Sequence, residues 1–133
     1  PEAPDDPRYN QEVRRRLHAL PGWADLPDAA SVARGRAGDR EQGTEVAFAV
    51  RIERNRVAEA RFRAFGCPHV LAAASWVAEV ALGLDCDQLA AWDWQEAASV
   101  LGVPPAKFGR LLTLQDAIRA VVRNWPSTTG STV

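Results

Sequence analysis

The feature of this sequence that most constrains its fold is a pair of stretches in which apolar residues alternate with polar or small ones. In the first stretch, Glu45 to Glu53, the apolar positions are Val46, Phe48, Val50 and Ile52. A period of two predicts a half-buried strand. The second stretch, Ala58 to Ala64, has the same period, and between the two lies Arg54-Asn55, where asparagine tolerates a positive φ. We therefore predict an antiparallel hairpin.

The sequence after this hairpin favours helices. Pro68 to Leu82 contains a single charged residue, Glu79, which is typical of a helix buried on most sides. Further helices are expected at Cys86–Ala91, Gln95–Leu101 and Thr113–Asn124. Thr113 and Asp116 stand where a capping box would begin the last of these.

Before the hairpin, we expect a short helix over Gln11–Leu20 and a strand over Ser31–Arg36, followed by a polar loop from Gly38 to Gly43. One helix, a small sheet and then several helices predict an α+β fold. Its form would be a two-layer sandwich, with an antiparallel sheet of about three strands packed on the helices.

The length of 133 residues is that of one domain. We expect this domain to span residues 11–125, between a flexible leader at 1–10 and a disordered tail at 126–133. The leader is acidic and rich in proline, unlike a signal peptide. No apolar run is long enough to cross a bilayer.

The charge of the chain and its cysteines narrow the class of function. The net charge of −1, from 16 basic and 17 acidic residues, favours neither nucleic acid nor an anionic membrane as a partner. Two cysteines, Cys67 and Cys86, do not suggest a disulfide framework in a domain with ample core. A reducing compartment, and hence a cytoplasmic location, is the expectation.

Cys67 is the candidate functional residue, because it lies between a predicted strand and a helix that would begin at Pro68. Proline favours the first position of a helix, so Cys67 would be the N-cap residue. There it would face unpaired N–H groups and the positive end of the helix dipole, which favour a thiolate. The alternative is a small buried cysteine that fills the corner between strand and helix.

Other potential ligands are few. Cys67 and His69 could chelate as a Cys-x-His pair, but two ligands do not make a zinc or iron site, so we do not expect zinc. Asp39 could add a carboxylate, or it could be an ordinary turn aspartate. Cys86 lies between Asp85 and Asp87, whose charges should raise its pKa and make it unreactive.

Four segments resemble, in order, those of the IscU/NifU N-terminal family of iron–sulfur cluster scaffolds. They are the run from Ala58 to Phe65-Gly66-Cys67, the small residues Ala72 to Ser75, the segment Val103-Pro104-Pro105-Ala106-Lys107 and the segment Asp116 to Ala120. The resemblance covers roughly Arg34 to Asn124.

The resemblance implies a function and a ligand set. Members of the family hold a nascent cluster on three cysteines and an aspartate, receive sulfur from a cysteine desulfurase, and release the cluster with an Hsp70-type chaperone. Thiolates are the usual cluster ligands. Cys67 and Asp39 would be ligands here, with His69 a weaker candidate, and Val103 to Lys107 would contact the chaperone. The two prolines could instead only separate two helices.

The sequence departs from the family at the other ligands. Ala37 and Arg110 stand where the family has its first and third cysteines, and Gly109 replaces a neighbouring histidine. Two protein ligands are too few for a cluster that needs about four. Arg110 would place a permanent cation beside Cys67, which could stabilise a thiolate or persulfide and disfavour iron.

Three hypotheses follow, and none of them makes the chain an enzyme. The first is a degenerate cluster scaffold that binds no cluster by itself, or one iron–sulfur cluster between the two chains of a homodimer. The second is a single-cysteine sulfur acceptor, like the related SufE fold, that works with a cysteine desulfurase. The third is an adaptor that keeps only its protein-binding surfaces. No nucleic acid and no membrane is expected as a partner.

Overall fold

The hairpin predicted from the alternating residues forms the centre and one edge of the sheet. In the computed structural model, which describes residues 9–126, β2 (Thr44–Glu53) pairs antiparallel with β3 (Arg56–Phe65). Arg54 and Asn55 between them have φ values of +53° and +63°, as a tight hairpin turn requires. The first strand, β1 (Val32–Asp39), pairs with the other edge of β2, which gives the order β1-β2-β3.

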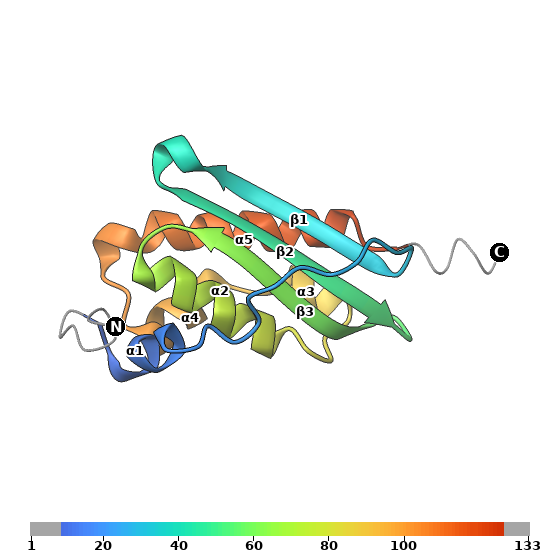
Figure 1. Cartoon of the computed structure of the whole chain (residues 1–133), viewed down its shortest axis with the longest axis horizontal. Coiled ribbons are helices and arrows are strands. Elements are labelled where there is room, and N and C mark those ends of the chain that lie inside the picture. Colours follow the sequence, from blue (N-terminus) through green and yellow to red (C-terminus); the bar gives the residue numbers. More distant parts are fainter. Residues whose placement is uncertain (1–8, 127–133) are drawn as a thin grey trace.

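Five α-helices complete the domain, and Figure 1 shows the larger ones covering one face of the sheet. They are α1 (Gln11–Leu17), α2 (Pro68–Val80), α3 (Cys86–Ala90), α4 (Trp94–Leu101) and α5 (Phe108–Arg123). Two single turns of 3₁₀ helix, η2 (Arg40–Gln42) and η3 (Pro105–Lys107), precede β2 and α5. The predicted α+β sandwich with a three-stranded antiparallel sheet is confirmed.

The core lies between the sheet and the two longest helices. Val46, Phe48, Val50 and Ile52 point toward the helices, as the alternation predicted, and are buried. Leu111 and Leu114 of α5 are fully buried against them. Gly35 of β1 allows α5 to come closer still, because a Cβ atom at this position would lie 2.3 Å from the Ala117 carbonyl oxygen.

Several predicted boundaries are wrong. The first helix ends at Leu17 rather than Leu20, whose φ of +45° is not helical. β1 continues to Asp39, so the expected Gly38–Gly43 loop is reduced to the η2 turn and Gly43.

The last helix begins at Phe108, so Thr113 cannot be its cap. Its hydroxyl instead donates to the Gly109 carbonyl oxygen one turn back, at 3.5 Å. The expected capping box of Thr113 and Asp116 is therefore wrong. A capping box is found at α3, where Asp85 and Gln88 exchange hydrogen bonds with each other's backbone N–H.

The domain begins earlier than its predicted boundary. Tyr9 is buried, and the Asn10 side chain accepts a hydrogen bond from the Val13 N–H at 2.9 Å, capping α1. Both residues were expected in the leader. The rest of the expected leader and residues 127–133 of the expected tail lie outside the described residues. Within residues 9–126, no helix is both long and apolar enough to cross a membrane.

The topology brings several chain ends together. β1 and β3 both run antiparallel to β2, so their last residues lie at the same end of the sheet. α2 starts there directly after β3, and Figure 1 shows the start of α5 at that end too. The candidate site is at this end of the molecule.

Candidate functional site

Cys67 occupies the N-cap position of α2, as predicted. Its backbone is extended, with φ −75° and ψ 167°, and Pro68 is the first helical residue. The Cys67 carbonyl oxygen accepts hydrogen bonds from the N–H groups of Val70, at 2.9 Å, and Leu71, at 3.1 Å. The side chain forms no capping hydrogen bond and is half-buried. The helix start is therefore held by the backbone, and the sulfur is left for other partners.

The surroundings of the sulfur favour the thiolate. Burial raises the pKa of the Cys67 thiol, but interactions with the His69 side chain, the Val70 N–H and the Arg110 guanidinium together lower it to about 6. Such groups stabilise the negative charge by hydrogen bonding and by their own positive charge. At pH 7 a thiol with this pKa is roughly nine-tenths ionised. The thiolate is therefore the favoured form of Cys67 at neutral pH.

His69, whose side chain helps to lower the Cys67 pKa, is itself close to a lysine. His69 is 2% exposed, and its Nδ1 lies 3.5 Å from Lys107 Nζ. Its Nε2 has no hydrogen-bond partner among residues 9–126. The Tyr9 ring packs edge-on against the imidazole at a centroid distance of 4.8 Å, and Lys107 Nζ lies 5.8 Å from the centre of the same ring. Sequence reasoning missed this approach of Lys107, because it depends on how η3 packs against α2.

The two positions where the family resemblance implies cysteine, Ala37 and Arg110, lie at the same end of the fold. Ala37, half-buried, is paired with Val46, which is paired in turn with Ala64 near the end of β3. The next residue, Gly38, lies against α5, since a Cβ there would be 2.9 Å from the Thr113 methyl group. Arg110, in the first turn of α5, is near enough to Cys67 to help lower its pKa.

Asp39, the other candidate ligand, already has a local hydrogen-bond partner. Asp39 is the last residue of β1, is exposed, and its carboxylate accepts a hydrogen bond from the Glu41 N–H at 2.8 Å, which caps η2. β1 and β3 are two strand spacings apart, about 10 Å. Among residues 9–126, no three His, Cys, Asp or Glu side chains are grouped so as to hold a metal ion. The weaker candidate ligand, His69, has Lys107 next to one of its ring nitrogens.

The segment proposed for chaperone contact is only partly an extended loop. Pro104 is extended, but Pro105, Ala106 and Lys107 form the η3 turn. Val103 is buried, whereas Pro104, Pro105 and Ala106 are exposed. A short proline turn therefore projects from the surface just before α5.

The second cysteine has the opposite character. Burial raises the pKa of Cys86, and the carboxylates of Asp87 and Asp85 raise it further. The sequence-based prediction of a raised pKa is confirmed, although burial is the larger cause. Gly109 is exposed, and a Cβ atom there would meet nothing within 4 Å. A larger residue would therefore fit at that position.

The fold and the site together define a class of protein. It is a small α+β domain with one cysteine of lowered pKa between an edge strand of the sheet and a helix. The sequence profile of the NifU-like N terminal domain family matches residues 9–132, so the chain belongs to that family. This confirms the family resemblance inferred from the four segments.

Two curated relatives are named for iron-sulfur cluster assembly and for nitrogen fixation. The chain is 31% identical over 88 residues to the iron-sulfur cluster assembly protein IscU of Plasmodium falciparum, covering 66% of this chain and 54% of that protein. It is 40% identical over 80 residues to the nitrogen fixation protein NifU of Cereibacter sphaeroides, covering 60% of this chain and 32% of that protein. The chain thus spans about half or less of these relatives.

Solved structures share the fold. A putative iron-sulfur cluster assembly scaffold protein for the SUF system, from Fervidobacterium islandicum, superposes with a TM-score of 0.64 at 13% identity, covering 86% of this chain and 96% of that one. A NifU-like N-terminal protein from Brucella abortus gives a TM-score of 0.60 at 14% identity, with coverages of 86% and 94%. At these identities the likeness concerns the fold alone.

Proposed function

We propose that this chain works in iron–sulfur cluster assembly as a sulfur acceptor, which carries sulfur as a persulfide on Cys67 and holds no whole cluster by itself. Membership of the NifU-like family and relatives named for iron-sulfur cluster assembly support the pathway. The observation that carries the finer proposal is the Cys67 thiol at the start of α2, whose pKa is lowered by the His69 side chain, the Val70 N–H and Arg110, which stands where the family resemblance places a third cysteine.

The proposed chemistry needs no outside oxidant. The Cys67 thiolate attacks the outer sulfur of a donor persulfide, R–S–SH, and a new S–S bond forms on Cys67. The donor's S–S bond breaks, and its inner sulfur leaves as a thiolate with the bonding electron pair. One sulfur atom thus moves from the donor to Cys67, and no net oxidation or reduction takes place. The donor would be a cysteine desulfurase.

The cations around Cys67 fit this chemistry. A persulfide is an anion at neutral pH, so Arg110 stabilises the product as well as the attacking thiolate. Arginine stays protonated throughout, so it cannot accept the proton that the Cys67 thiol or persulfide loses on ionisation. The same charge repels ferrous iron.

An entire cluster would be poorly held. A cluster is the cargo of this family, and it needs about four ligands. At the ligand positions this chain offers the Cys67 thiolate and the Asp39 carboxylate, and the latter already caps η2. We therefore expect a cluster only where a second chain supplies a second Cys67.

A chaperone contact is proposed at the exposed proline turn, Pro104, Pro105 and Ala106. An Hsp70-type chaperone binds extended peptide, so the turn would have to open. Loss of Hsp70 binding in Pro104→Gly/Pro105→Gly, with binding retained in Cys67→Ser, is expected. Equal binding by both variants would contradict this contact.

The experiment that tests the sulfur-acceptor role is intact mass spectrometry after anaerobic incubation with a cysteine desulfurase and cysteine. We expect one added sulfur atom on the wild-type chain and on Cys86→Ser, and none on Cys67→Ser. If the wild-type chain takes up no sulfur while iodoacetamide alkylates Cys67 readily, the proposal is wrong.

A further inference from the structure

The sheet face opposite α2 and α5 carries an ordered set of arginines. Side chains at alternate positions of paired strands share a face, so each row across the sheet can be read from the strand register. Two successive rows are Arg34–Ala49–Arg61 and Arg36–Ala47–Arg63, from β1, β2 and β3. Four arginines thus flank a floor of two alanines on the central strand.

A groove follows this floor. One hollow of about 370 Å³ lies between the four arginines, with Ala24 and Asp25 on one side. These two residues belong to the segment that crosses this face in Figure 1. A second hollow, also of about 370 Å³, shares Ala47, Arg36 and Arg63 with the first and extends to Trp23 and Phe65. The groove therefore runs along β2 toward the end of the sheet where Cys67 lies.

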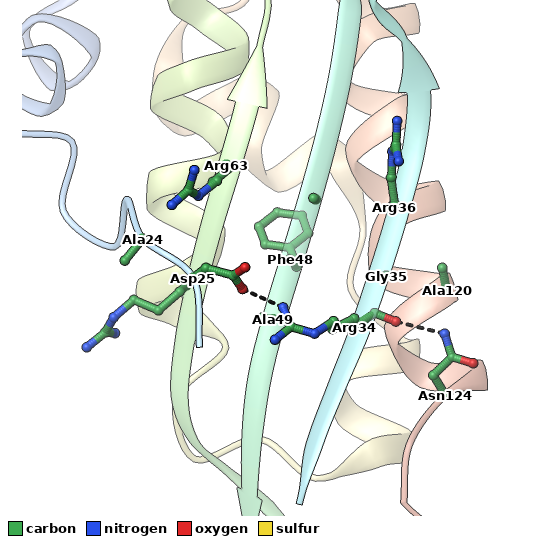
Figure 2. Close-up of a pocket in the computed structure, with 12 residues that line it drawn as sticks. Ala24, Asp25, Arg34, Gly35, Arg36, Phe48, Ala49, Arg63, Ala120 and Asn124 are labelled. Atoms are coloured by element: carbon green, nitrogen blue, oxygen red, sulfur yellow. Dashed lines mark hydrogen bonds and ion pairs between the residues drawn. The ribbon is translucent and has the colours of Figure 1, made fainter. Parts of the chain in front are cut away.

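The charge in the groove is positive and only partly balanced. Four arginines and one aspartate line the first hollow. Figure 2 shows Arg34 turned to Asp25, and Arg34 is also bound to Asp28. Arg36 is 73% exposed in its side chain and pairs with Glu45.

Arg63 stands apart from these pairs. Within the part of the chain that the structure describes, it makes no hydrogen bond or ion pair. Arg63 is thus the cation of the groove that is left to attract an anion, and the largely exposed Arg36 lies in the same row.

We propose that this groove binds an extended acidic segment of a partner protein. The two arginine rows are two residues apart, about 7 Å along the strands, which is also the spacing of alternate side chains in an extended peptide. Carboxylates on alternate residues would therefore meet successive rows, and arginine binds carboxylates with two parallel hydrogen bonds. Ala47 is partly exposed, and its small side chain lets a peptide backbone come close.

Two further observations favour a peptide over nucleic acid. The net charge of the whole chain is −1, whereas nucleic-acid binding draws on a general excess of basic residues. The groove ends at two aromatic residues, Trp23 at 44% and Phe65 at 43% exposure, which offer apolar contact to a side chain of the same segment. A partner bound here would extend toward Cys67, but the groove is independent of the sulfur chemistry.

The test is fluorescence anisotropy with a labelled peptide of about ten residues, alternating glutamate and threonine, at low salt. The same peptide with glutamine for glutamate is the reference. We expect the wild-type chain to prefer the glutamate peptide by about ten-fold or more, and Arg36→Ser/Arg63→Ser to lose that preference. Arg119→Ser/Arg123→Ser removes two exposed arginines of α5 and the same net charge, and it should bind like the wild type.

Nuclear magnetic resonance supplies a measurement on the folded wild-type chain. Titration with the glutamate peptide should shift the methyl signals of Ala47 and Ala49, and the signal of Ala58, at the far end of β3, should stay in place. The proposal is overturned if the Ala47 and Ala49 signals do not shift. It is also overturned if both double variants lose the preference for the glutamate peptide equally, or if a uridylate oligonucleotide binds more tightly than the peptide.

Discussion

Arg110, in the first turn of α5, helps to lower the pKa of Cys67 at the start of α2, after the His69 side chain and the Val70 N–H. A permanent cation thus stands where the family resemblance expects a cysteine. Under the proposed function, an arginine at this position takes the place of a cluster ligand and favours the thiolate of Cys67. The proposal thus connects arginine in place of cysteine at position 110 with sulfur transfer in place of cluster binding.

Replacing Arg110 by glutamine should raise the pKa of Cys67 above its value of about 6, because burial then acts against fewer stabilising partners. The midpoint of the iodoacetamide reaction rate against pH, followed at Cys67 by peptide mapping, measures this shift. Arg119→Gln, an exposed arginine further along α5, is the control and should leave the midpoint in place. An unchanged midpoint in Arg110→Gln would mean that the arginine does not act on the thiol.

The lowered pKa also predicts a pH dependence of stability. The pKa of Cys67 is about 6 in the folded chain and 9.0 for a free thiol, so folding favours the thiolate form. The resulting stabilisation is complete above pH 9 and is lost as the pH falls toward 6. The unfolding free energy of the wild-type chain, measured in urea and compared with Cys67→Ser, should therefore increase from pH 6 to pH 9. Cys86→Ser retains Cys67 and should keep this increase, since the pKa of Cys86 is raised rather than lowered.

Alanine should lower the stability of the fold at Gly35 and raise it at Gly109. At Gly35 a methyl group would lie 2.3 Å from the Ala117 carbonyl oxygen and the Val121 nitrogen, so α5 would have to move away from β1. Overpacking of this kind costs about 1–3 kcal/mol or more. At Gly109 the methyl group meets nothing within 4 Å, and alanine favours a helix by about 0.5–1 kcal/mol. Urea unfolding of both variants measures the two effects, and destabilisation by Gly109→Ala would contradict this description of α5.

Restoring the lost thiols should restore cluster binding. Ala37→Cys/Arg110→Cys places three thiols at the end of the fold where β1, α2 and α5 meet, and should gain the visible absorption of a cluster on anaerobic reconstitution. Ala37→Ser/Arg110→Ser is the matched control and should remain colourless. If both variants stay without a cluster although both are folded, the assignment of positions 37 and 110 as former ligands is wrong.

The parts of the fold that a local pattern describes could be predicted, and those that depend on packing could not. The hairpin followed from large apolar residues at alternate positions of β2. β1 was predicted too short, since Gly35 and Ala37 stand where large apolar residues would show the period. α5 was predicted too short because Gly109 and the exposed Leu112 interrupt its apolar stripe at the start.

The candidate site divides in the same way. Cys67 could be found because glycine before it and proline after it mark a strand that turns directly into a helix. The contact of Lys107 with His69 depends on the packing of η3 on α2. The arginine groove depends on the register of three strands, which pairs Arg36 with Ala47 and Ala47 with Arg63.

The most direct test of the central claim is anaerobic native mass spectrometry of the chain after incubation with a cysteine desulfurase, cysteine and ferrous iron. One spectrum then reports both sulfur on the chain and any bound cluster. The predicted species is a monomer with one added sulfur, which is absent in Cys67→Ser. A monomer that carries a whole iron–sulfur cluster in stoichiometric amount would contradict the account.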